Sequence, residues 1–212
     1  MDSKERGVFI VLEGLDRCGK TTQINLLEKY LLSKNIRCYL MKFPERSTEI
    51  GKMIDRYLLS NTDIEDHVIH LLFSANRWEL SEKIEKMLSD GINIICDRYV
   101  YSGIAFSSSK QNLKYEWCYS SDIGLPEPDC VLFLDIPVEE CSLRKNYGEE
   151  RYEKIEFQKK VYYNFKKLEE KNNKIWFKVN AMDDIDSISK KICDISLSII
   201  DKCKLSNIKY IN

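Results

Sequence analysis

An octapeptide near the amino terminus constrains the fold more than any other feature of this sequence. Residues 14–21 read G-L-D-R-C-G-K-T and match the pattern G-x-x-x-x-G-K-[S/T]. They follow a short apolar run at residues 8–12 and precede residues 22–32, whose apolar side chains recur at helical spacing. This context predicts a phosphate-binding loop, in which backbone N–H groups surround phosphate oxygens, Lys20 reaches the β- and γ-phosphates and Thr21 offers a hydroxyl to Mg²⁺. The alternative is an ordinary glycine-rich turn ahead of a helix.

Short apolar, β-branched segments alternate along the chain with longer segments of helical periodicity. The short segments, which we expect to be strands, lie at residues 8–12, 38–41, 92–96, 131–134 and 175–179. Continuous apolar strands of this kind pair in parallel through right-handed helical crossovers. The sequence therefore predicts an α/β fold, a doubly wound parallel β-sheet of about five strands with helices on both faces. Because no glycine-rich or proline-rich linker divides the chain, we expect a single domain over residues 1–212.

The charge balance excludes several classes of protein. The 33 lysine and arginine residues are offset by 34 aspartate and glutamate residues, so the net charge is only -1. This argues against a nucleic-acid coat or a polybasic membrane arm, and the run at residues 8–12 is too short for a signal sequence or a membrane span. Eight cysteines without a C-x-x-C pair favour reduced thiols. We expect a cytoplasmic protein, with the nucleus as the alternative, and neither a nucleic-acid nor a membrane partner.

A second acidic element is expected beside the phosphate-binding loop. Residues 91–97 read G-I-N-I-I-C-D, an apolar strand that ends in the carboxylate of Asp97. The carboxyl ends of the strands of an open parallel sheet face one crevice, so Asp97 and Thr21 are predicted to hold Mg²⁺ there. The alternative is that Asp97 caps the helix that follows.

Aromatic and arginine side chains follow at positions that suit a second, smaller anion and a flat ring. Arg46 follows the second strand, and Phe73 and Arg77 are four residues apart on a predicted helix. We interpret the last two as a ring for stacking and a guanidinium for a carbonyl oxygen, with core packing of Phe73 as the alternative. The small residues Ser102 and Gly103 leave space for a ring to approach the backbone. The chain lacks a complete N-K-x-D motif, which weakens a guanine-nucleotide switch and favours a kinase for a small acceptor.

Six motifs together resemble the eukaryotic thymidylate kinases (dTMP kinases). They are G-L-D-R-C-G-K-T-T, F-P-E-R-S-T-E-I-G, H-L-L-F-S-A-N-R-W-E, D-R-Y-x-x-S-G, G-L-P-x-P-D and G-E-E-R-Y-E, and the match runs from about residue 8 to about residue 165. The resemblance implies a P-loop NTPase-type core with a mobile lid at about residues 144–153, and a homodimer. It also implies Mg²⁺-dependent transfer of the γ-phosphoryl group of ATP to dTMP, giving dTDP and ADP, in dTTP synthesis.

The same resemblance implies four overlapping sets of site residues. The ATP-binding residues would be Gly14, Leu15, Asp16, Arg17, Cys18, Gly19, Lys20, Thr21, Thr22 and Arg144. The dTMP-binding residues would be Asp16, Phe43, Pro44, Arg46, Leu58, Phe73, Arg77, Arg98, Ser102, Gly103, Phe106 and Tyr152. The catalytic residues would be Asp16, Arg17, Lys20 and Arg98, and the metal ligands would be Thr21 and Asp97.

Individual roles at the acceptor end follow from the resemblance as well. Phe73 would stack on thymine, and Arg77 would contact the O4 atom of that base. Arg46 and Arg98 would hold the acceptor phosphate, and Asp16 would bind the 3′-hydroxyl of the sugar. Tyr152 would lie against the deoxyribose, where a 2′-hydroxyl would clash with it.

Three arginines are candidates for the γ-phosphate. Arg17 resembles the branch of the family that places its catalytic arginine inside the loop, while Arg144 and Arg151 fall in the predicted lid. The alternative for Arg151 is a surface ion pair with Glu149 or Glu153. Six of the nine arginines, at positions 17, 46, 77, 98, 144 and 151, are thus expected at the site, and Lys20 is the one lysine expected there.

Cys18 departs from the family pattern, in which a small Ala or Ser is expected. A thiol among backbone N–H donors, Arg17 and Lys20 is predicted to have a depressed pKa and high reactivity. The alternative is a small, buried packing residue. Elsewhere, His67 and His70 are expected to pack on a helix face or contact a partner, and residues 117–118 are expected to lie in a connection.

Two other functions stay open at this point. One is a related kinase with a different acceptor, such as a deoxynucleoside, which would have no phosphate for Arg46 and Arg98 to hold. The other is a non-catalytic, nucleotide-dependent binding module on the same fold.

Overall fold

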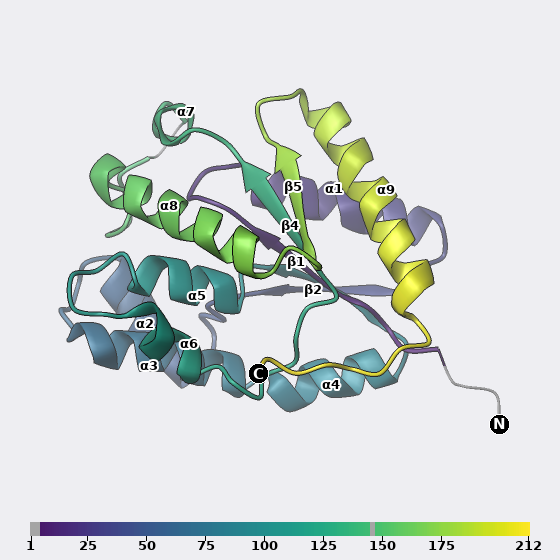
Figure 1. Ribbon diagram of the computed structural model, residues 1–212, viewed down its shortest axis with the longest axis horizontal. Helices are drawn as coiled ribbons and strands as arrows, with labels where there is room; N and C mark the ends of the chain where they lie inside the picture. The colour runs from purple at the N-terminus through teal and green to yellow at the C-terminus, as the bar shows by residue number, and fades with distance from the viewer. Residues whose placement is uncertain (1–4, 145–146) are drawn as a thin grey trace.

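Five parallel strands form the sheet, and each begins and ends within one residue of a predicted strand. They are β1 (Phe9–Glu13), β2 (Cys38–Lys42), β3 (Asn93–Asp97), β4 (Cys130–Asp135) and β5 (Trp176–Asn180). The computed structural model describes residues 5–144 and 147–212, so residues 145 and 146 of the predicted lid lie outside the described residues. The strand order is β2-β3-β1-β4-β5 (Figure 1). This confirms the predicted α/β fold with a doubly wound parallel sheet.

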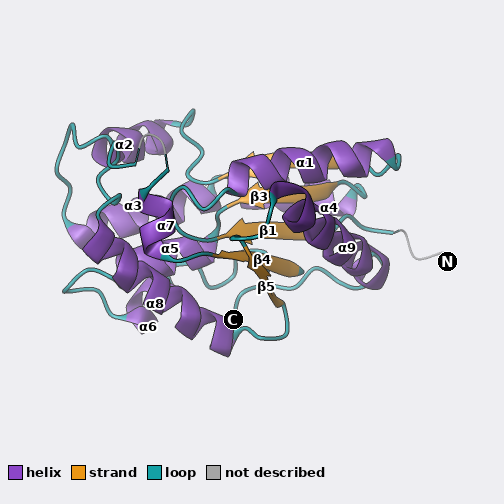
Figure 2. Ribbon diagram, turned by 90° about the horizontal axis from the view of Figure 1, so that it is seen from above, coloured by secondary structure: helices purple, strands orange, loops and turns teal. Residues whose placement is uncertain are grey.

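Helices cover both faces of this sheet. They are α1 (Lys20–Ser33), α2 (Glu49–Leu58), α3 (Asp66–Trp78), α4 (Ser81–Ser89), α5 (Val100–Ser107), α6 (Tyr115–Ser120), α7 (Val138–Ser142), α8 (Ile155–Lys171) and α9 (Ile185–Cys203). Helices α1 and α9 pack together on one face, while α4, α5 and α8 lie on the other (Figures 1 and 2). None of the helices within the described ranges combines the length and the apolar character that a bilayer crossing requires.

Helix α6 corrects an expectation from the sequence. Residues 117–118 were expected in a connection, but they belong to this helix of six residues. Cys118 is buried, and its backbone carbonyl accepts a hydrogen bond from Nε2 of His70 in α3 at 3.0 Å. A helix this short has little intrinsic stability, so its packing on α5 and its contacts with the two histidines of α3 account for it.

The central strands carry the core, and β1 determines where the functional groups meet. All five residues of β1 are buried, and so are all five of β3. From β1 the chain moves to one side of the sheet for β2 and β3 and to the other side for β4 and β5. In an open parallel sheet, ligands bind at the carboxyl ends of the strands beside such a switch point. The crevice is therefore expected after Glu13, the last residue of β1.

A second, smaller apolar cluster joins α2 and α3 to the segment ahead of α8. Its buried members are Ile54, Tyr57, Leu58, Ile69 and Tyr152. The cluster is separate from the main core, which lies on both faces of the sheet, and it holds Tyr152 against α2. It links the predicted lid to the helices that bear Leu58 and Phe73.

Candidate active site

The phosphate-binding loop has the backbone geometry that its glycines allow. Gly14 has φ of 146° and Gly19 has φ of 105°, a region in which residues with a Cβ are strained. A Cβ at Gly14 would also lie 2.8 Å from Sγ of Cys18, closer than atoms pack. Lys20 begins α1 and is buried, and its Nζ donates to the carbonyl of Leu15 at 2.8 Å. The ammonium thus lies inside the loop, beside the helix N-terminus that attracts anions.

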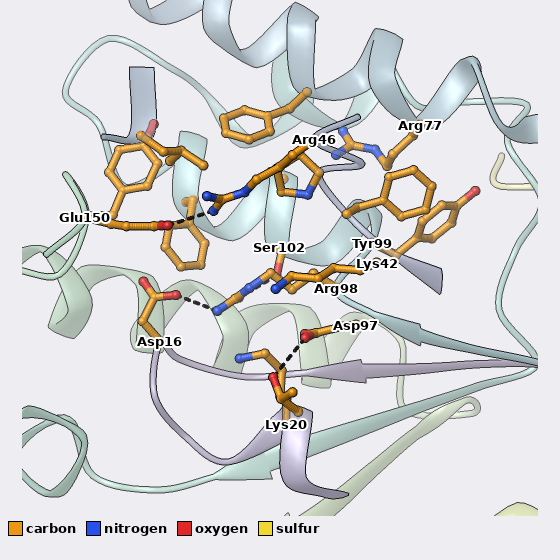
Figure 3. Close-up of a pocket in the computed structure, with 18 of the residues that line it drawn as sticks. Asp16, Lys20, Lys42, Arg46, Arg77, Asp97, Arg98, Tyr99, Ser102 and Glu150 are labelled. Carbon is orange, nitrogen blue, oxygen red and sulfur yellow. Dashed lines mark hydrogen bonds and ion pairs between the residues drawn. The ribbon is translucent and has the colours of Figure 1, made fainter. Parts of the chain in front are cut away.

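Thr21 and Asp97 come together beneath this loop, as predicted for a metal site. The Thr21 hydroxyl lies 3.5 Å from Oδ2 of Asp97. Asp97 ends β3 next to β1, at the Lys20 end of the cleft (Figure 3). Within the described residues, the buried Oδ1 of Asp97 has no hydrogen-bond partner. A hydroxyl and a carboxylate with an unused buried oxygen are ligands that suit Mg²⁺, so these residues fit that ion.

Glu13, not Asp97, caps the helix that follows β3, so the capping alternative for Asp97 is wrong. The fully buried Glu13 carboxylate accepts hydrogen bonds from the backbone N–H groups of Tyr99 at 2.9 Å and Ser102 at 3.0 Å, at the start of α5. Burial raises the pKa of the Glu13 carboxyl, while hydrogen bonds and Arg98 oppose that rise. Sequence reasoning missed Glu13, although an acidic residue between an apolar strand and Gly14 was a signal for it.

Arg98 and Asp16 form an ion pair across the mouth of the loop. Nη2 of Arg98 lies 2.6 Å from Oδ1 of Asp16, and Nη1 donates to the carbonyl of Gly14 at 2.9 Å (Figure 3). Arg98 has φ of 67°, an uncommon conformation for a residue with a side chain. The other carboxylate oxygen of Asp16 accepts from Nε2 of Gln158 at 2.7 Å. Gln158 is a residue that sequence reasoning missed.

The lid segment contacts the loop through Arg17 and Arg144. Nε of Arg17 donates to Oε1 of Glu153 at 2.8 Å, and Nη1 of Arg144 donates to the Arg17 carbonyl at 2.6 Å. The second oxygen of Glu153 accepts from the backbone N–H groups of residues 148, 149 and 150. Like Arg98, Arg17 has positive φ, at 62°. Glu153 was named in the sequence analysis only as a partner for Arg151.

Arg151 does not belong to the cleft, which corrects its expected place in the site. Its guanidinium lies 4.2 Å from the centre of the Tyr57 ring and donates to the Tyr57 carbonyl at 2.9 Å. Its ion pair is with Asp63 at 2.7 Å. The alternative pairing of Arg151 with Glu149 or Glu153 is therefore also wrong, because Arg17 makes those contacts.

All twelve predicted acceptor residues line one cleft with a volume of about 290 Å³. The cleft also contains Lys20, Thr21 and Asp97, and Figure 3 shows Arg46 and Arg77 on the opposite side from Lys20. Lys42 lines it too, so the expectation that Lys20 is the one lysine of the site is wrong. Lys42 directly precedes the motif F-P-E-R, which was the signal for it.

Arg46 is held at the cleft by carboxylates from two directions. Its Nη1 lies 2.6 Å from Oδ1 of Asp55, and its Nη2 lies 2.7 Å from Oε1 of Glu150. The loop that bears Arg46 is anchored by the buried Asn76, whose Oδ1 accepts from the backbone N–H of Glu45 at 2.7 Å. The Arg46 guanidinium thus reaches the cleft from a fixed backbone.

Tyr152 reaches the cleft with its ring held on both sides. It stacks on Phe157, with ring centres 5.1 Å apart, and its hydroxyl donates to that of Tyr57 at 3.3 Å.

Cys18 is only 2% exposed, so burial favours the packing alternative for that thiol over high reactivity.

Three comparisons place these features among known proteins. The family model for thymidylate kinase matches residues 12–192. The thymidylate kinase of Schizosaccharomyces pombe is 46% identical over 208 residues, 98% of this chain and 97% of that protein. The human thymidylate kinase is 44% identical over 187 residues, 88% of each chain. The solved structure of thymidylate kinase from Candida albicans superimposes with a TM-score of 0.86 at 38% identity, covering 98% of this chain and 99% of that one.

Proposed function

Because this chain belongs to the thymidylate kinase family, which phosphorylates dTMP, we propose that the cleft between Lys20 and Arg77 transfers the γ-phosphoryl group of ATP to dTMP with Mg²⁺. The kinase activity and ATP as the donor follow from family membership. The roles of single residues, the metal, the lid, the dimer and the cellular location are our proposals.

The observation that carries the assignment is the meeting of two anion sites in one cleft. Lys20 lies at one end of the cleft, with Thr21 next to it in the sequence, and Arg98 lies between Lys20 and Arg46 (Figure 3). Two anionic reactants can therefore be held with their phosphates adjacent, which is the main requirement for phosphoryl transfer.

No general base is required for this reaction. The acceptor is a phosphate monoester with a second pKa of about 6, so its attacking oxygen is largely deprotonated at neutral pH. Catalysis then depends on positioning and on stabilising the negative charge that spreads over the transferring group. We assign positioning of the acceptor phosphate to Arg46 and Arg98, and of the sugar 3′-hydroxyl to Asp16.

Charge stabilisation falls to Arg17, Lys20 and the metal ligands. Arg17 would act as an internal arginine finger, a role typically worth roughly 10³–10⁵ in rate. Thr21 and Asp97 would hold Mg²⁺, which would supply positive charge to offset the charge of the phosphates. The segment that carries Arg144 and Glu153 would close as a lid and exclude water, which competes with dTMP as an acceptor.

A panel of acceptors tests the proposed function. We expect ADP release, followed by a coupled assay, to be fastest with dTMP and detectable with dUMP, because one methyl group changes binding by only roughly 1–3 kcal/mol. Thymidine is the control, because a deoxynucleoside kinase would prefer it and would not need Arg46 and Arg98. Absence of ADP release with every monophosphate would instead favour a binding module.

We propose a homodimer formed through the outer face of α3. Val68 and Leu71 on that helix are each 48% exposed and Trp78 is 42% exposed, and Trp117 of α6 packs against His67, the residue before Val68. A contiguous apolar face of this kind is typical of protein interfaces. Light scattering should give the mass of two chains, and Leu71→Asp should give that of one; a monomeric wild-type protein would contradict the proposal.

We also propose a cytoplasmic or nuclear location. All eight cysteines lie in the described residues and none is in a disulfide, which suits a reducing compartment. Microscopy of a tagged protein in its own cells tests this.

A further inference from the structure

Arg77 is a buried guanidinium that is only partly satisfied by the protein. Its Nε lies 3.1 Å from Oδ1 of Asp122, and its Nη2 lies 2.7 Å from Oδ2. The two side chains are 3% and 0% exposed. Within the described residues, Asp122 takes hydrogen bonds from Nε and Nη2 of Arg77 and none is found for Nη1, and Arg77 lines the cleft. Nη1 is therefore the guanidinium nitrogen that can donate to an acceptor on a ligand in the cleft.

The Asp122 carboxylate is itself fixed by one face of α3. The hydroxyl of Ser74 donates to Oδ1 of Asp122 at 2.8 Å. One turn away on each side, the Trp78 indole donates to the Ser121 carbonyl at 2.9 Å, and Nε2 of His70 lies 3.1 Å from the Ser121 hydroxyl. Residues at this spacing share a helix face. The loop that bears Asp122 is therefore anchored directly to the helix that bears Arg77.

The carboxyl-terminal residues hold the same loop from the other side. The backbone N–H of Gly124 donates to the Ile211 carbonyl at 2.8 Å, and that of Ile211 donates to the Leu125 carbonyl at 2.9 Å. Ile211 is buried. Asp122 therefore lies on a loop with little freedom to move.

Gly103 limits the remaining freedom of the guanidinium. A Cβ at this position would lie 2.8 Å from Nη2 and 2.9 Å from Nη1 of Arg77. The guanidinium thus packs directly on the backbone of α5, with Asp122 at one edge. Together these contacts restrict the guanidinium and leave Nη1 as the nitrogen not bound by Asp122.

We propose that Asp122 is the positioning residue that determines which bases the enzyme accepts. By binding Nε and Nη2, Asp122 leaves Arg77 one nitrogen, Nη1, for the cleft. The N–H groups of Nη1 only donate, which suits a ring carbonyl and opposes an exocyclic amino group. Thymine and uracil offer a carbonyl at O4, whereas cytosine carries an amino group there. The proposal rests on the proposed contact of Arg77 with O4. Asp122 touches no substrate and acts through Arg77.

Steady-state kinetics of Asp122→Asn with dTMP, dUMP and dCMP test this. The Asn amide keeps the shape of the Asp122 side chain but binds the Arg77 guanidinium more weakly. In the wild type we expect strong rejection of dCMP, because a site built to hydrogen-bond one group rejects an analogue that lacks it. We expect KM for dTMP to rise by about 10- to 100-fold with kcat much less affected and KM for ATP unchanged. The ratio of kcat/KM for dTMP to that for dCMP should fall by at least about tenfold.

Asp129→Asn is the matched control, because Asp129 also pairs with a largely buried arginine. It holds Arg6 through two hydrogen bonds, at 2.6 and 2.8 Å, at the opposite end of the strands. Asp129→Asn should lower the unfolding temperature without changing the ratio of dTMP to dCMP. If Asp122→Asn does not fold, the same ratio is measured in Asp122→Glu. This variant keeps the charge but displaces the carboxylate by one methylene, so the ratio of kcat/KM for dTMP to that for dCMP should fall there as well.

A folded Asp122 variant with the wild-type KM for dTMP and the wild-type base ratio would overturn the inference. Failure of the wild-type enzyme to phosphorylate dTMP would overturn the proposed function instead. The first result comes from an Asp122 variant and the second from the wild-type enzyme, so the two failures are distinguishable.

Discussion

The carboxylate of Glu153 accepts a hydrogen bond from Nε of Arg17 at 2.8 Å and connects the phosphate-binding loop to the segment ahead of α8. Glu153 is buried, and its other oxygen is occupied by three backbone N–H groups of its own turn. Because these hydrogen bonds fix the Glu153 carboxylate, the carboxylate in turn fixes the position of the Arg17 guanidinium. This contact couples the placement of the arginine to the conformation of the lid.

Arg17→Gly should lower kcat by at least about 100-fold, because an arginine finger stabilises charge that develops only in the transition state. The unfolding temperature should change little. Two ion pairs are lost, but glycine adopts the φ of 62° without strain, and this offsets the loss. Arg151→Ala is the control in the same region of the chain and should leave kcat near the wild-type value, since Arg151 lies outside the cleft. A loss in Arg17→Gly smaller than about tenfold would remove Arg17 from the catalytic residues.

Local sequence patterns predicted the strands and the phosphate-binding loop because both depend on neighbouring residues. Continuous burial of β1 and β3 requires apolar runs, and the loop requires glycines at fixed spacing. The roles of Glu13, Asp122 and Gln158 depend instead on contacts across 86, 45 and 142 residues of sequence, which spacing does not reveal.

The errors at Arg151 and at α6 have the same origin. Arg151 lies near Glu149 and Glu153 in the sequence, but the turn directs it to Asp63 on the far side of Tyr57. Helix α6 is polar and aromatic in sequence, and contacts with α5 and with His70 stabilise it. In both cases tertiary contacts outweighed the local pattern.

Alkylation rates should rank the cysteines by exposure. Cys38 and Cys203 are half-buried, whereas the other six, Cys18 included, are buried. We expect a thiol reagent to label Cys38 and Cys203 first, because a reagent must reach the sulfur before any thiolate can react. Peptide mapping over time checks this with and without ATP; fastest labelling at Cys18 would restore the reactive-thiol hypothesis.

Asp97→Asn should weaken Mg²⁺ binding without harming the fold, since its Oδ1 has no partner within the described residues. We expect kcat at a fixed Mg²⁺ concentration to fall by roughly 100-fold, because such a metal supplies several kcal/mol of charge stabilisation. Titration calorimetry with Mg²⁺ and ATP gives a readout independent of turnover. Asp135→Asn, at the end of β4, is the control and should behave as wild type; an unchanged metal affinity in Asp97→Asn would contradict the assignment.

Tyr57→Phe should weaken discrimination against ribonucleotides. The Tyr57 hydroxyl accepts from Tyr152 at 3.3 Å and from Nζ of Lys110 at 3.1 Å, and it thereby holds the ring that we place against the deoxyribose. Both hydrogen bonds are lost, and loss of the one from Tyr152, worth about 1 kcal/mol, should raise the ratio of kcat/KM for UMP to that for dUMP by roughly 3- to 10-fold. Tyr163→Phe, on the exposed side of α8, should leave this ratio unchanged. A wild-type ratio in Tyr57→Phe, equal to that in Tyr163→Phe, would show that the Tyr57 hydroxyl does not position Tyr152.

His70 should make the protein less stable as the pH falls. The ring is fully buried, and burial, together with the charge of Arg77, lowers the pKa of His70 to about 4. Nε2 donates to the Cys118 carbonyl, so Nδ1 of the neutral ring accepts from the Ser107 hydroxyl at 2.8 Å. Protonation would place a donor against that hydroxyl and a second positive charge near Arg77.

The sign of this effect follows from the unfolded chain, in which His70 takes up a proton near pH 6.5. Above that pH neither state is protonated, and His70 contributes no pH dependence. Between pH 6.5 and about 4 the unfolded state binds the proton and the folded state does not, so the free energy of unfolding decreases. Its contribution should amount to about 2 kcal/mol between pH 7 and pH 5.

Urea unfolding of wild type and two glutamine variants at these two pH values measures the contribution of His70. His70→Gln should lose about 2 kcal/mol less between pH 7 and pH 5 than the wild type does. His67→Gln is the matched control, because His67 is the other histidine of the chain and is exposed. It should keep the wild-type difference. Equal pH dependence in wild type and His70→Gln would mean that the His70 ring is protonated in the folded protein as readily as in the unfolded chain.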